Sequence, residues 1–435
     1  MGCVKLMVEE QLYLYVSAVA KESHMKLEES SKKKFYQWLP EERRAFLTEK
    51  GIKLSEIDSE TLERLDKLSE NVIGQVRLPL GVLPKLIVNG KDYQVPMAVE
   101  EPSVVAAANH AAKIFNQNGG AVADSKRNGI YGQIVLEVTD NFDLTKFTTE
   151  FPQLISLANK KFVSLVKHGG GVRKIEASQK ENLVFLRVLV DPAEAMGANK
   201  TNAILEFLGN ELEKQPDIEQ TLYAILSNYP TQLTSAKVSL SIDSVGGLKV
   251  AKKIALLSKI GQTDIYRAVT NNKGIMNGID SVLVATGNDY RGVEAATAVW
   301  ANKNGAYTSL SKWKIEEDRL VGTVTVPLAI GVVGGSIKAR RDVQQSFSLL
   351  GNISAKQLAE VIATTGLANN FSALLAISTK GIQAGHMKLQ ARNLVATLKA
   401  SEGEKAIVLK KLQESKKYTQ EAAFEFLNEI RKDQK

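Results

Sequence analysis

The hydrophobic positions of this 435-residue chain change their period along its length. From Glu41 to about Leu68 apolar residues recur at helical spacing between charges, which predicts helix. Between Gly81 and Val99 two alternating apolar runs flank Asn89-Gly90, and this pattern predicts a β-hairpin. An Ala-rich apolar stretch from Pro102 to Phe115 then predicts a helix that begins at the proline. The first quarter of the chain therefore mixes helix with antiparallel strand.

The middle of the chain alternates between strand-like and helix-like segments. Strands are predicted over Gly132 to Val138 and over Leu183 to Val190. Helices are predicted over Leu154 to Val166 and over Asn202 to Glu213. This alternation over about 100 residues indicates an α/β or α+β domain.

Helical periodicity dominates the rest of the chain. One short apolar segment, Ser281 to Thr286, is predicted as a buried strand, and Ser354 has the side chain of a helix N-cap. The predicted helices are Ala251 to Ile260, Arg291 to Ala301, Ala355 to Ala363, Ala368 to Ser378 and Met387 to Ala400.

The composition is ordinary for a globular protein, with 44% hydrophobic residues, 24% charged residues and a net charge of +8. No aromatic residues interleave with a basic stripe, so the charge does not predict nucleic-acid binding. The apolar run from Gln11 to Ala20 is about half the length of a membrane span. We therefore expect a cytoplasmic protein. Ser23-His24-Met25 is compatible with a cloning junction or an internal start, so residues 1–24 do not enter the fold prediction.

Few residues are available for metal chemistry. Cys3 is the single cysteine, which excludes an intrachain disulfide framework and a Cys-based zinc cluster and fits a reducing compartment. The four histidines are His24, His110, His168 and His386. We therefore expect no metal, and chemistry carried by carboxylates, lysines and one or two histidines.

Common catalytic and nucleotide-binding templates are absent from the sequence. It contains no Gly-x-Gly-x-x-Gly between a strand and a helix and no phosphate-binding Gly-x-x-x-x-Gly-Lys-Ser/Thr. It also contains no His-Glu-x-x-His zinc helix and no Gly-x-Ser-x-Gly nucleophile elbow. A Rossmann domain and the common hydrolases are therefore not predicted.

Four polar strings remain as candidates for a site, and each also has an ordinary structural explanation. Glu100 to Ser103 separates an apolar strand from an apolar helix, where carboxylates stabilise a helix start. Asn271 to Asp280 holds a lone lysine in what we predict to be a Gly/Asn-rich loop. Ala285 to Asp289 follows the predicted buried strand and also suits a turn. Gly381 to Met387 places a glycine-flanked histidine at a helix start.

Taken together, these strings resemble the class II (bacterial-type) 3-hydroxy-3-methylglutaryl-coenzyme A reductases. The resemblance runs in the family's order from about residue 69 to 395. The matching strings are Glu70-Asn-Val-Ile-Gly74, Glu100-Glu-Pro-Ser-Val-Val-Ala-Ala107, Ala195-Met-Gly-Ala-Asn199, Ile225-Leu-Ser-Asn228, Asn272-Lys-Gly-Ile-Met-Asn-Gly-Ile279, Ala285-Thr-Gly-Asn-Asp289 and Gly385-His-Met387.

The resemblance implies a two-step, four-electron reduction of (S)-3-hydroxy-3-methylglutaryl-coenzyme A to (R)-mevalonate and coenzyme A, in the mevalonate pathway of isoprenoid biosynthesis. Lys273 carries over as the cation that stabilises the oxyanion, with Asp289 as its partner. Glu101 carries over as the acid for the aldehyde-level oxygen. His386 carries over as the acid for the leaving thiolate, on a mobile flap.

The resemblance also implies binding residues and an α+β architecture. A large substrate-binding domain of residues 1–124 and 231–378 would hold an inserted small non-Rossmann dinucleotide-binding domain, residues 125–230. Residues 379–435 would form a C-terminal helical flap, and two chains would form a homodimer that shares its active sites. The substrate contacts carry over to Ser103, Asn228, Arg267 and Asn277. The cofactor contacts are placed at Lys160, Lys161, Phe162, Glu194, Met196, Gly197, Ala198 and Asn199.

Three positions depart from the family pattern. Asn271 and Glu194 stand where histidine and aspartate are usual, and we expect little effect from either. Phe162 follows Ala158-Asn159 at the position where NADH-preferring members carry a carboxylate for the ribose hydroxyls. Without that carboxylate a 2′-phosphate is not repelled, and Lys160 or Lys161 is available to attract it. The sequence therefore predicts a preference for NADPH, with NADH possible.

Two rival functions are compatible with parts of the sequence. Mevalonate oxidation with NAD would use the same fold in the catabolic direction, and Phe162 argues against it. A non-catalytic protein that binds coenzyme A or nucleic acid would also account for the positive charge.

Overall fold

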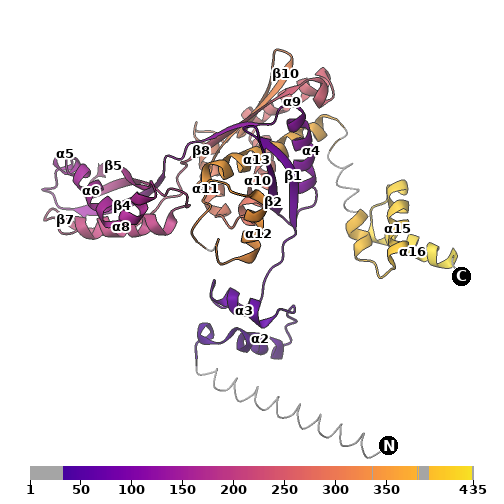
Figure 1. The fold of residues 1–435 in the computed structure, drawn as a ribbon, viewed down its shortest axis with the longest axis horizontal. Helices are drawn as coiled ribbons and strands as arrows, with labels where there is room; N and C mark the ends of the chain where they lie inside the picture. The colour runs from indigo at the N-terminus through magenta and orange to yellow at the C-terminus, as the bar shows by residue number, and fades with distance from the viewer. Residues whose placement is uncertain (1–32, 336, 380, 382–390, 434–435) are drawn as a thin grey trace, which may run out of the picture. The chain divides into compact units, whose positions relative to one another are not determined.

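The computed structural model describes residues 33–335, 337–379, 381 and 391–433 (Figure 1). The chain divides into two compact units, residues 1–78 and 79–435. In the described residues every pair of strands in a sheet is antiparallel. Helices and antiparallel sheets together make a mixed α+β fold.

The first unit is built around a buried arginine. Arg43 is 2% exposed, and its Nη1 donates to Asp66 Oδ1 at 2.5 Å. A buried charge requires such a partner, because desolvation without one is costly. The predicted helical region from Glu41 to Leu68 is confirmed as helices separated by an irregular connection. The elements are η1 (Phe35–Gln37), α2 (Pro40–Glu49) and α3 (Ser59–Asp66).

The second unit begins with the predicted hairpin. Strands β1 (Leu80–Val88) and β2 (Lys91–Ala98) pair in antiparallel fashion on either side of Asn89-Gly90. Helix α4 (Val104–Gln117) follows, and it begins two residues later than Pro102. The reason is Ser103, whose φ of +80° is left-handed and cannot belong to the helix.

A four-stranded sheet and three long helices form the main core of this unit. The sheet order is β3-β8-β10-β9. Helix α13 packs against both α10 and α4. The elements are β3 (Val122–Ser125), β8 (Leu233–Ser241), η2 (Asp243–Val245), α9 (Leu248–Thr263), α10 (Ile265–Ala285), β9 (Ser311–Glu316), β10 (Arg319–Pro327) and α13 (Ala355–Ser378).

Helix α10 overturns two predictions. Two predictions are wrong here, the strand Ser281 to Thr286 and the lysine-bearing loop Asn271 to Asp280. Both segments belong to this one 21-residue helix, with Thr286 as its C-cap. A short apolar run does not distinguish a strand from a buried helix. The glycines that suggested a loop serve packing instead. A Cβ on Gly278 would lie 2.7 Å from the Thr365 carbonyl oxygen, so the glycine allows α10 and α13 to approach closely.

Helix α13 joins two predicted helices into one. The Ser354 cap is confirmed, since its side chain accepts from the Gln357 N–H. The break predicted between Ala363 and Ala368 is absent. Among the described helices, α13 alone is long and apolar enough to cross a membrane, but 78% of its apolar window is buried inside the structure. It is therefore the central core helix of the unit.

A second four-stranded sheet, of order β5-β6-β4-β7, carries its own core. Helices α6 and α8 pack against β5 and β7 respectively. The predicted strands are confirmed, and α8 begins earlier than Asn202. The helix predicted over Leu154 to Val166 is divided into α6 and α7 at Phe162, whose backbone is not helical. The elements are β4 (Ile130–Val138), α5 (Leu144–Thr148), α6 (Phe151–Lys161), α7 (Val163–Lys167), β5 (Gly171–Lys180), β6 (Leu183–Asp191), α8 (Ala198–Leu212) and β7 (Ile218–Leu226).

The remaining helices complete the second unit. Helix α11 confirms the prediction over Arg291 to Ala301. A separate cluster of buried residues lies between Ala391 and Ile430. The start of the predicted helix Met387 to Ala400 lies outside the described residues. The elements are α11 (Tyr290–Ala301), α12 (Arg341–Leu350), α15 (Glu402–Ser415) and α16 (Gln420–Asp433).

Candidate active site

Two adjacent asparagines determine which face of α10 points outward. Asn271 and Asn272 are 5% and 2% exposed. Asn272 Nδ2 donates to the Thr308 carbonyl oxygen at 3.0 Å, and Asn271 Nδ2 donates to Ser309 Oγ at 2.5 Å. These bonds attach α10 to the segment that precedes β9 and fix its rotation about its axis. The next residue, Lys273, consequently faces outward.

The Lys273 ammonium meets a carboxylate from a distant part of the chain. Its Nζ donates to Glu101 Oε2 at 2.5 Å, across 172 residues of sequence. Glu101 lies in the bend between β2 and α4, and the left-handed Ser103 closes that bend. The Ser103 Oγ is buried and has no hydrogen-bond partner among the described residues. A cation, a carboxylate and an unpaired hydroxyl group therefore belong to one small region.

This ion pair contributes little to the stability of the chain. The Lys273 and Glu101 side chains are 59% and 37% exposed, and exposed pairs of this kind contribute about 0–1 kcal/mol. Two long side chains are nevertheless held in one geometry, at a cost in conformational entropy. The contribution of this pair to stability therefore gives no reason for its geometry.

Helix α10 also carries two of the predicted substrate residues, on different faces. Asn277 lies one turn beyond Lys273 and shares its face. Arg267 lies six residues before Lys273, about 120° around the helix. Its Nη2 donates to Asn271 Oδ1 at 3.3 Å, and its Nε is buried without an acceptor among the described residues. Burial lowers the pKa of Arg267 from its ordinary value, because it makes the charged guanidinium less favourable. An anionic partner would offset this desolvation.

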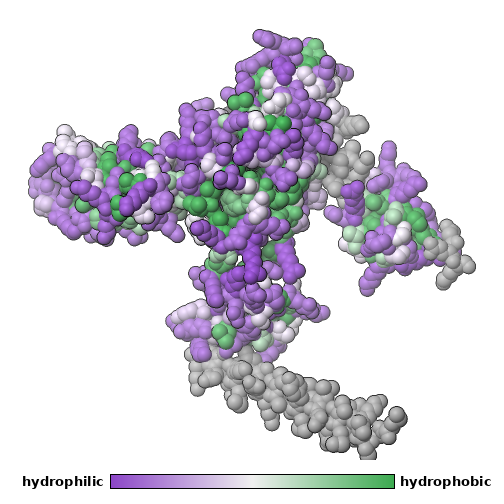
Figure 2. Space-filling view, in the orientation of Figure 1, coloured by the Kyte–Doolittle hydropathy of each residue, from purple (hydrophilic) through white to green (hydrophobic). Residues whose placement is uncertain are grey.

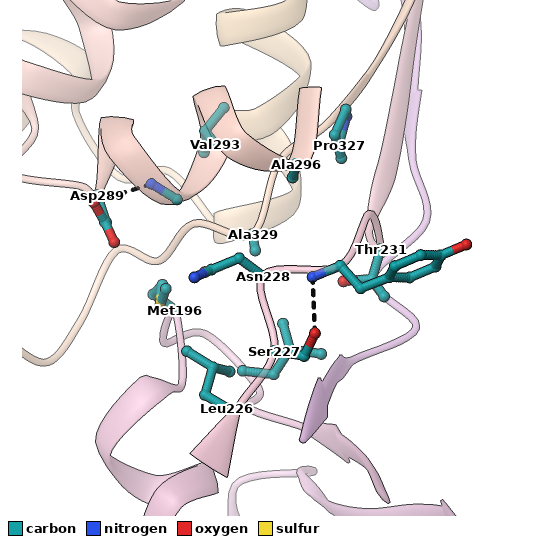
Figure 3. A pocket seen from close by; sticks show the side chains of 13 residues that line it. Met196, Leu226, Ser227, Asn228, Thr231, Asp289, Val293, Ala296, Pro327 and Ala329 are labelled. Atoms are coloured by element: carbon teal, nitrogen blue, oxygen red, sulfur yellow. Dashed lines mark hydrogen bonds between the residues drawn. The ribbon is translucent and has the colours of Figure 1, made fainter. Parts of the chain in front are cut away.

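Asp289 and Asn228 line a small pocket with a cavity volume of about 20 Å³. Asp289 is the N-cap of α11 and accepts from the N–H groups of Arg291 and Gly292. Figure 3 shows Asp289, Asn228 and Met196 side by side at this pocket. A Cβ on Gly292 would lie about 3 Å from both Asp289 Oδ2 and Asn228 Oδ1. Glycine at this position therefore lets two polar groups approach the helix closely. The pocket brings together residues predicted for catalysis, substrate binding and cofactor binding.

The predicted contact between Lys273 and Asp289 is not made within the chain. Lys273 and Leu283 are ten residues apart on α10, which is about 15 Å along the axis. The turn to Asp289 stays at that end, because the Asn288 N–H donates to the Leu283 carbonyl oxygen. Helical side chains also tilt toward the N-terminus, so Lys273 leans away from Asp289. One chain alone therefore places these two groups at separate sites.

The predicted cofactor string surrounds the start of α8. Gly197 caps this helix with a φ of +103°, and a Cβ there would lie 2.4 Å from Pro192 Cβ. Only glycine therefore fits. Met196 lines the pocket with Asp289, whereas the Glu194 carboxylate accepts from the Ala355 N–H at the start of α13. Glu194 thus connects this string to the core helix, a role that the sequence did not predict.

The other predicted residues are placed as follows. Lys160 and Lys161 end α6, and Phe162 separates α6 from α7. Ala198 and Asn199 form the first turn of α8. His386 lies outside the described residues. Within the described ranges no group of three or more His, Cys, Asp or Glu side chains is placed to hold a metal ion.

The family model of hydroxymethylglutaryl-coenzyme A reductase matches residues 39–391. The chain belongs to this reductase family. The match spans both four-stranded sheets and the Lys273–Glu101 pair.

Curated reductases and solved structures agree with this assignment. The chain is 37% identical over 377 residues to the 3-hydroxy-3-methylglutaryl-coenzyme A reductase of Archaeoglobus fulgidus, covering 85% of this chain and 86% of the relative. It is 35% identical to the probable reductase of Borreliella burgdorferi, covering 84% and 87%. The reductase of Streptococcus pneumoniae superposes with a TM-score of 0.70 at 38% identity, covering 91% and 99%. A class II structure from the same organism, bound to NADPH in open conformations, gives 0.70 at 40% identity, covering 82% and 97%.

The structure of this reductase also contains a carboxyl pair that sequence reasoning missed. Asp280 of α10 lies near Glu294 of α11, and its Oδ1 is buried without a partner in the described part of the chain. Burial and then the neighbouring Glu294 raise the pKa of Asp280 to about 8. The one available signal was a single carboxylate within the apolar stretch that ends α10.

This pair predicts a pH dependence of stability. The folded chain keeps the Asp280 proton up to about pH 8, while the unfolded chain loses it near pH 3.9. The stabilising contribution is therefore complete at acid pH and is lost as the pH rises from about 4 to about 8. Asp280→Asn should flatten the fall in the free energy of unfolding between pH 5 and 8, measured by denaturant titration. Asp318→Asn, in the exposed β9–β10 turn, is the control, and an unchanged slope in Asp280→Asn would contradict the assignment.

Proposed function

We propose that the chain reduces (S)-3-hydroxy-3-methylglutaryl-coenzyme A to (R)-mevalonate and coenzyme A with NADPH. Membership of the reductase family supports the reaction, and the NADPH-bound class II relative supports the cofactor and the reductive direction. The observation that carries the residue assignment is the Lys273–Glu101 contact. The oxidative and non-catalytic alternatives have no comparable support.

Lys273 is the group that stabilises charge on the substrate oxygen. The bound NADPH supplies hydride to the carbonyl carbon, and negative charge then develops on the carbonyl oxygen. An ammonium already in place at that oxygen lowers the energy of the transition state, most strongly where water is excluded. When Glu101 enters the step as the carboxylic acid, it passes its proton to Lys273 across this 2.5 Å contact, replaces the proton that Lys273 gives to the oxygen, and is left as the carboxylate. Glu101 thus acts as the acid at the aldehyde-level oxygen.

The proposed site is completed by a second copy of the chain. Lys273 and Asp289 belong to separate places within one chain, yet family resemblance assigns both to the same reaction. A two-fold dimer brings the Asp289 pocket of one chain to the Lys273–Glu101 pair of the other without unfolding α10. Asp289 would then stabilise the ammonium of Lys273 by its opposite charge.

Apolar residues beside Lys273 suit burial against such a partner. Figure 2 shows hydrophobic side chains at the surface of the unit formed by residues 79–435. Several lie at the junction of α9 and α10, where Tyr266 is 83% exposed. Exposed apolar side chains of this kind suit an interface with another chain. The exposed apolar residues at this junction are Leu256, Ile260, Ile265, Tyr266 and Val269.

Four residues are proposed to bind the substrate. Arg267 suits the free carboxylate, because its buried Nε–H has no acceptor among the described residues. Ser103 offers an unpaired hydroxyl near Glu101, and Asn277 shares the Lys273 face of α10. Asn228 lies beside Asp289 at the pocket and would contact the substrate held by the partner.

The second four-stranded sheet and its helices are proposed as the domain that binds the dinucleotide. Its core is separate from the main core, which supports residues 125–230 as the cofactor domain and residues 1–124 and 231–378 as the substrate domain. The proposed contacts are Lys160, Lys161, Phe162, Glu194, Met196, Gly197, Ala198 and Asn199. Met196, at one end of this set, lines the same pocket as Gly292 and Asp289.

Residues 379–435 are proposed as a flap that closes over the substrate. The separate buried cluster between Ala391 and Ile430 supports an independently packed segment. His386, in the connection to this segment, would protonate the departing thiolate of coenzyme A. A cytoplasmic location fits a chain that uses coenzyme A and NADPH.

The assignment of Glu101 is tested with a matched pair of variants. Glu101→Gln should lower kcat by about 10²-fold, because the general acid is lost while the hydrogen bond to Lys273 remains possible. Glu100→Gln, at the preceding residue of the same bend, should retain activity. The assay is substrate-dependent NADPH oxidation, with His386→Ala run in parallel. Equal rates for Glu101→Gln and Glu100→Gln would contradict the assignment.

A further inference from the structure

Lys200 is a lysine for which the described residues provide no acidic partner. It lies in the first turn of α8, where a cation is unfavourable beside the positive end of the helix. No acidic residue shares that turn, and in the described ranges no carboxylate forms an ion pair with Lys200. The ammonium is exposed. An anion that arrives from solution would supply the missing counter-charge.

Lys200 belongs to a cluster of lysines and aromatic rings from α6 and α8. Its Nζ lies 5.7 Å from the centroid of the Phe162 ring. Phe162 contacts Phe207 of α8 edge-to-face, with the centroids 5.9 Å apart. The Nζ of Lys161 lies over that second ring, 5.9 Å from its centroid. Each ring therefore has a different ammonium over it, and the one over Phe162 belongs to Lys200.

We propose that Lys200 selects NADPH over NADH by binding the 2′-phosphate of its adenosine ribose. The inference rests on the proposed function, in which the side chain at position 162 lies beside that ribose. The Phe162 ring offers an apolar surface for the nucleoside, and the ammonium above it meets the phosphate dianion. Lys161, the neighbour of Phe162 in sequence, directs its ammonium to the other ring and contributes less. The residue that determines specificity thus comes from a different helix than the sequence pattern indicates.

Binding of adenosine phosphates to the full chain tests this without turnover. Lys200→Ala should weaken binding of 2′,5′-ADP by about tenfold, the loss expected for one charge-assisted hydrogen bond, and leave 5′-ADP unchanged. Lys161→Ala should change 2′,5′-ADP binding less than Lys200→Ala does. Lys214→Ala is the control, since Lys214 follows the far end of α8 and pairs with Glu211. Calorimetric titration measures all four proteins.

Steady-state kinetics provides the second readout. In Lys200→Ala the KM for NADPH should rise by about tenfold, with kcat and the KM for NADH unchanged. Equal losses for 2′,5′-ADP and 5′-ADP, no loss in Lys200→Ala, or the larger loss in Lys161→Ala would each overturn the proposal. Selective binding of 2′,5′-ADP by a protein that does not reduce the substrate would refute the proposed function while supporting the role of Lys200.

Discussion

Lys273→Ala is expected to reduce kcat by about 10³-fold, the loss seen when one preorganised group at an oxyanion is removed. The ammonium is the cation that the structure places beside Glu101, at 2.5 Å. Its loss removes charge stabilisation in both hydride-transfer steps, since each step generates negative charge on the same oxygen. Stability should be little affected, because the Lys273 side chain is 59% exposed. The measurement is kcat from NADPH oxidation, with a thermal melt for each protein.

The chain contains a closely matched control for this variant. Lys314 pairs with Glu316 at 2.5 Å, and the two side chains are 67% and 41% exposed. This pair matches Lys273–Glu101 in length and in exposure, but lies on β9. Lys314→Ala should keep full activity and a similar melting temperature. Equal activity in Lys273→Ala and Lys314→Ala would remove Lys273 from the mechanism.

Heterodimers of two inactive variants are expected to regain activity. In a shared site, Lys273 of one chain works with Asp289 of the other. A dimer of one Lys273→Ala chain and one Asp289→Asn chain then contains one intact site and one doubly altered site, so it should reach about half of wild-type kcat. Each parent homodimer should be nearly inactive. Asparagine preserves the α11 cap, because its side-chain oxygen also accepts the N–H bonds that Asp289 accepts.

The heterodimer is isolated by coexpression of differently tagged chains and two affinity steps. A chain with both substitutions, paired with wild type, is the control. That dimer should have no intact site, because each of its sites lacks either Lys273 or Asp289. Activity in this control, with none in the first heterodimer, would mean that Lys273 and Asp289 act within one chain.

The sequence predicts those elements whose local signals agree with their packing. The Asn89-Gly90 hairpin and the Ser354 cap are both confirmed, because turn and cap chemistry act within a few residues. The prediction of a loop and a strand fails for α10. Its glycines and its short apolar run are there to pack against α13, and a local pattern does not contain that partner. The close approach of the two helices at Gly278 is a tertiary contact, and no local sequence pattern indicates it.

In the candidate site, too, contacts between distant segments are what local sequence patterns do not predict. Residues 101 and 273 are 172 positions apart, and only the resemblance to a family suggested that they act together. The sequence predicts that Asp289 lies close enough to Lys273 to pair with it, but within one chain an uninterrupted helix separates the two residues. Lys200 escaped notice because its significance depends on Phe162 of another helix. Spacing along the sequence does not report such contacts.

The stoichiometry of the wild-type reaction tests the central claim most directly. Purified protein is given limiting (S)-3-hydroxy-3-methylglutaryl-coenzyme A, and NADPH oxidation is followed together with released thiol and mevalonate. Reduction of a thioester to an alcohol takes four electrons, so the account predicts two NADPH oxidised for each thiol and each mevalonate formed. One NADPH per thiol, or thiol release without NADPH oxidation, would contradict it.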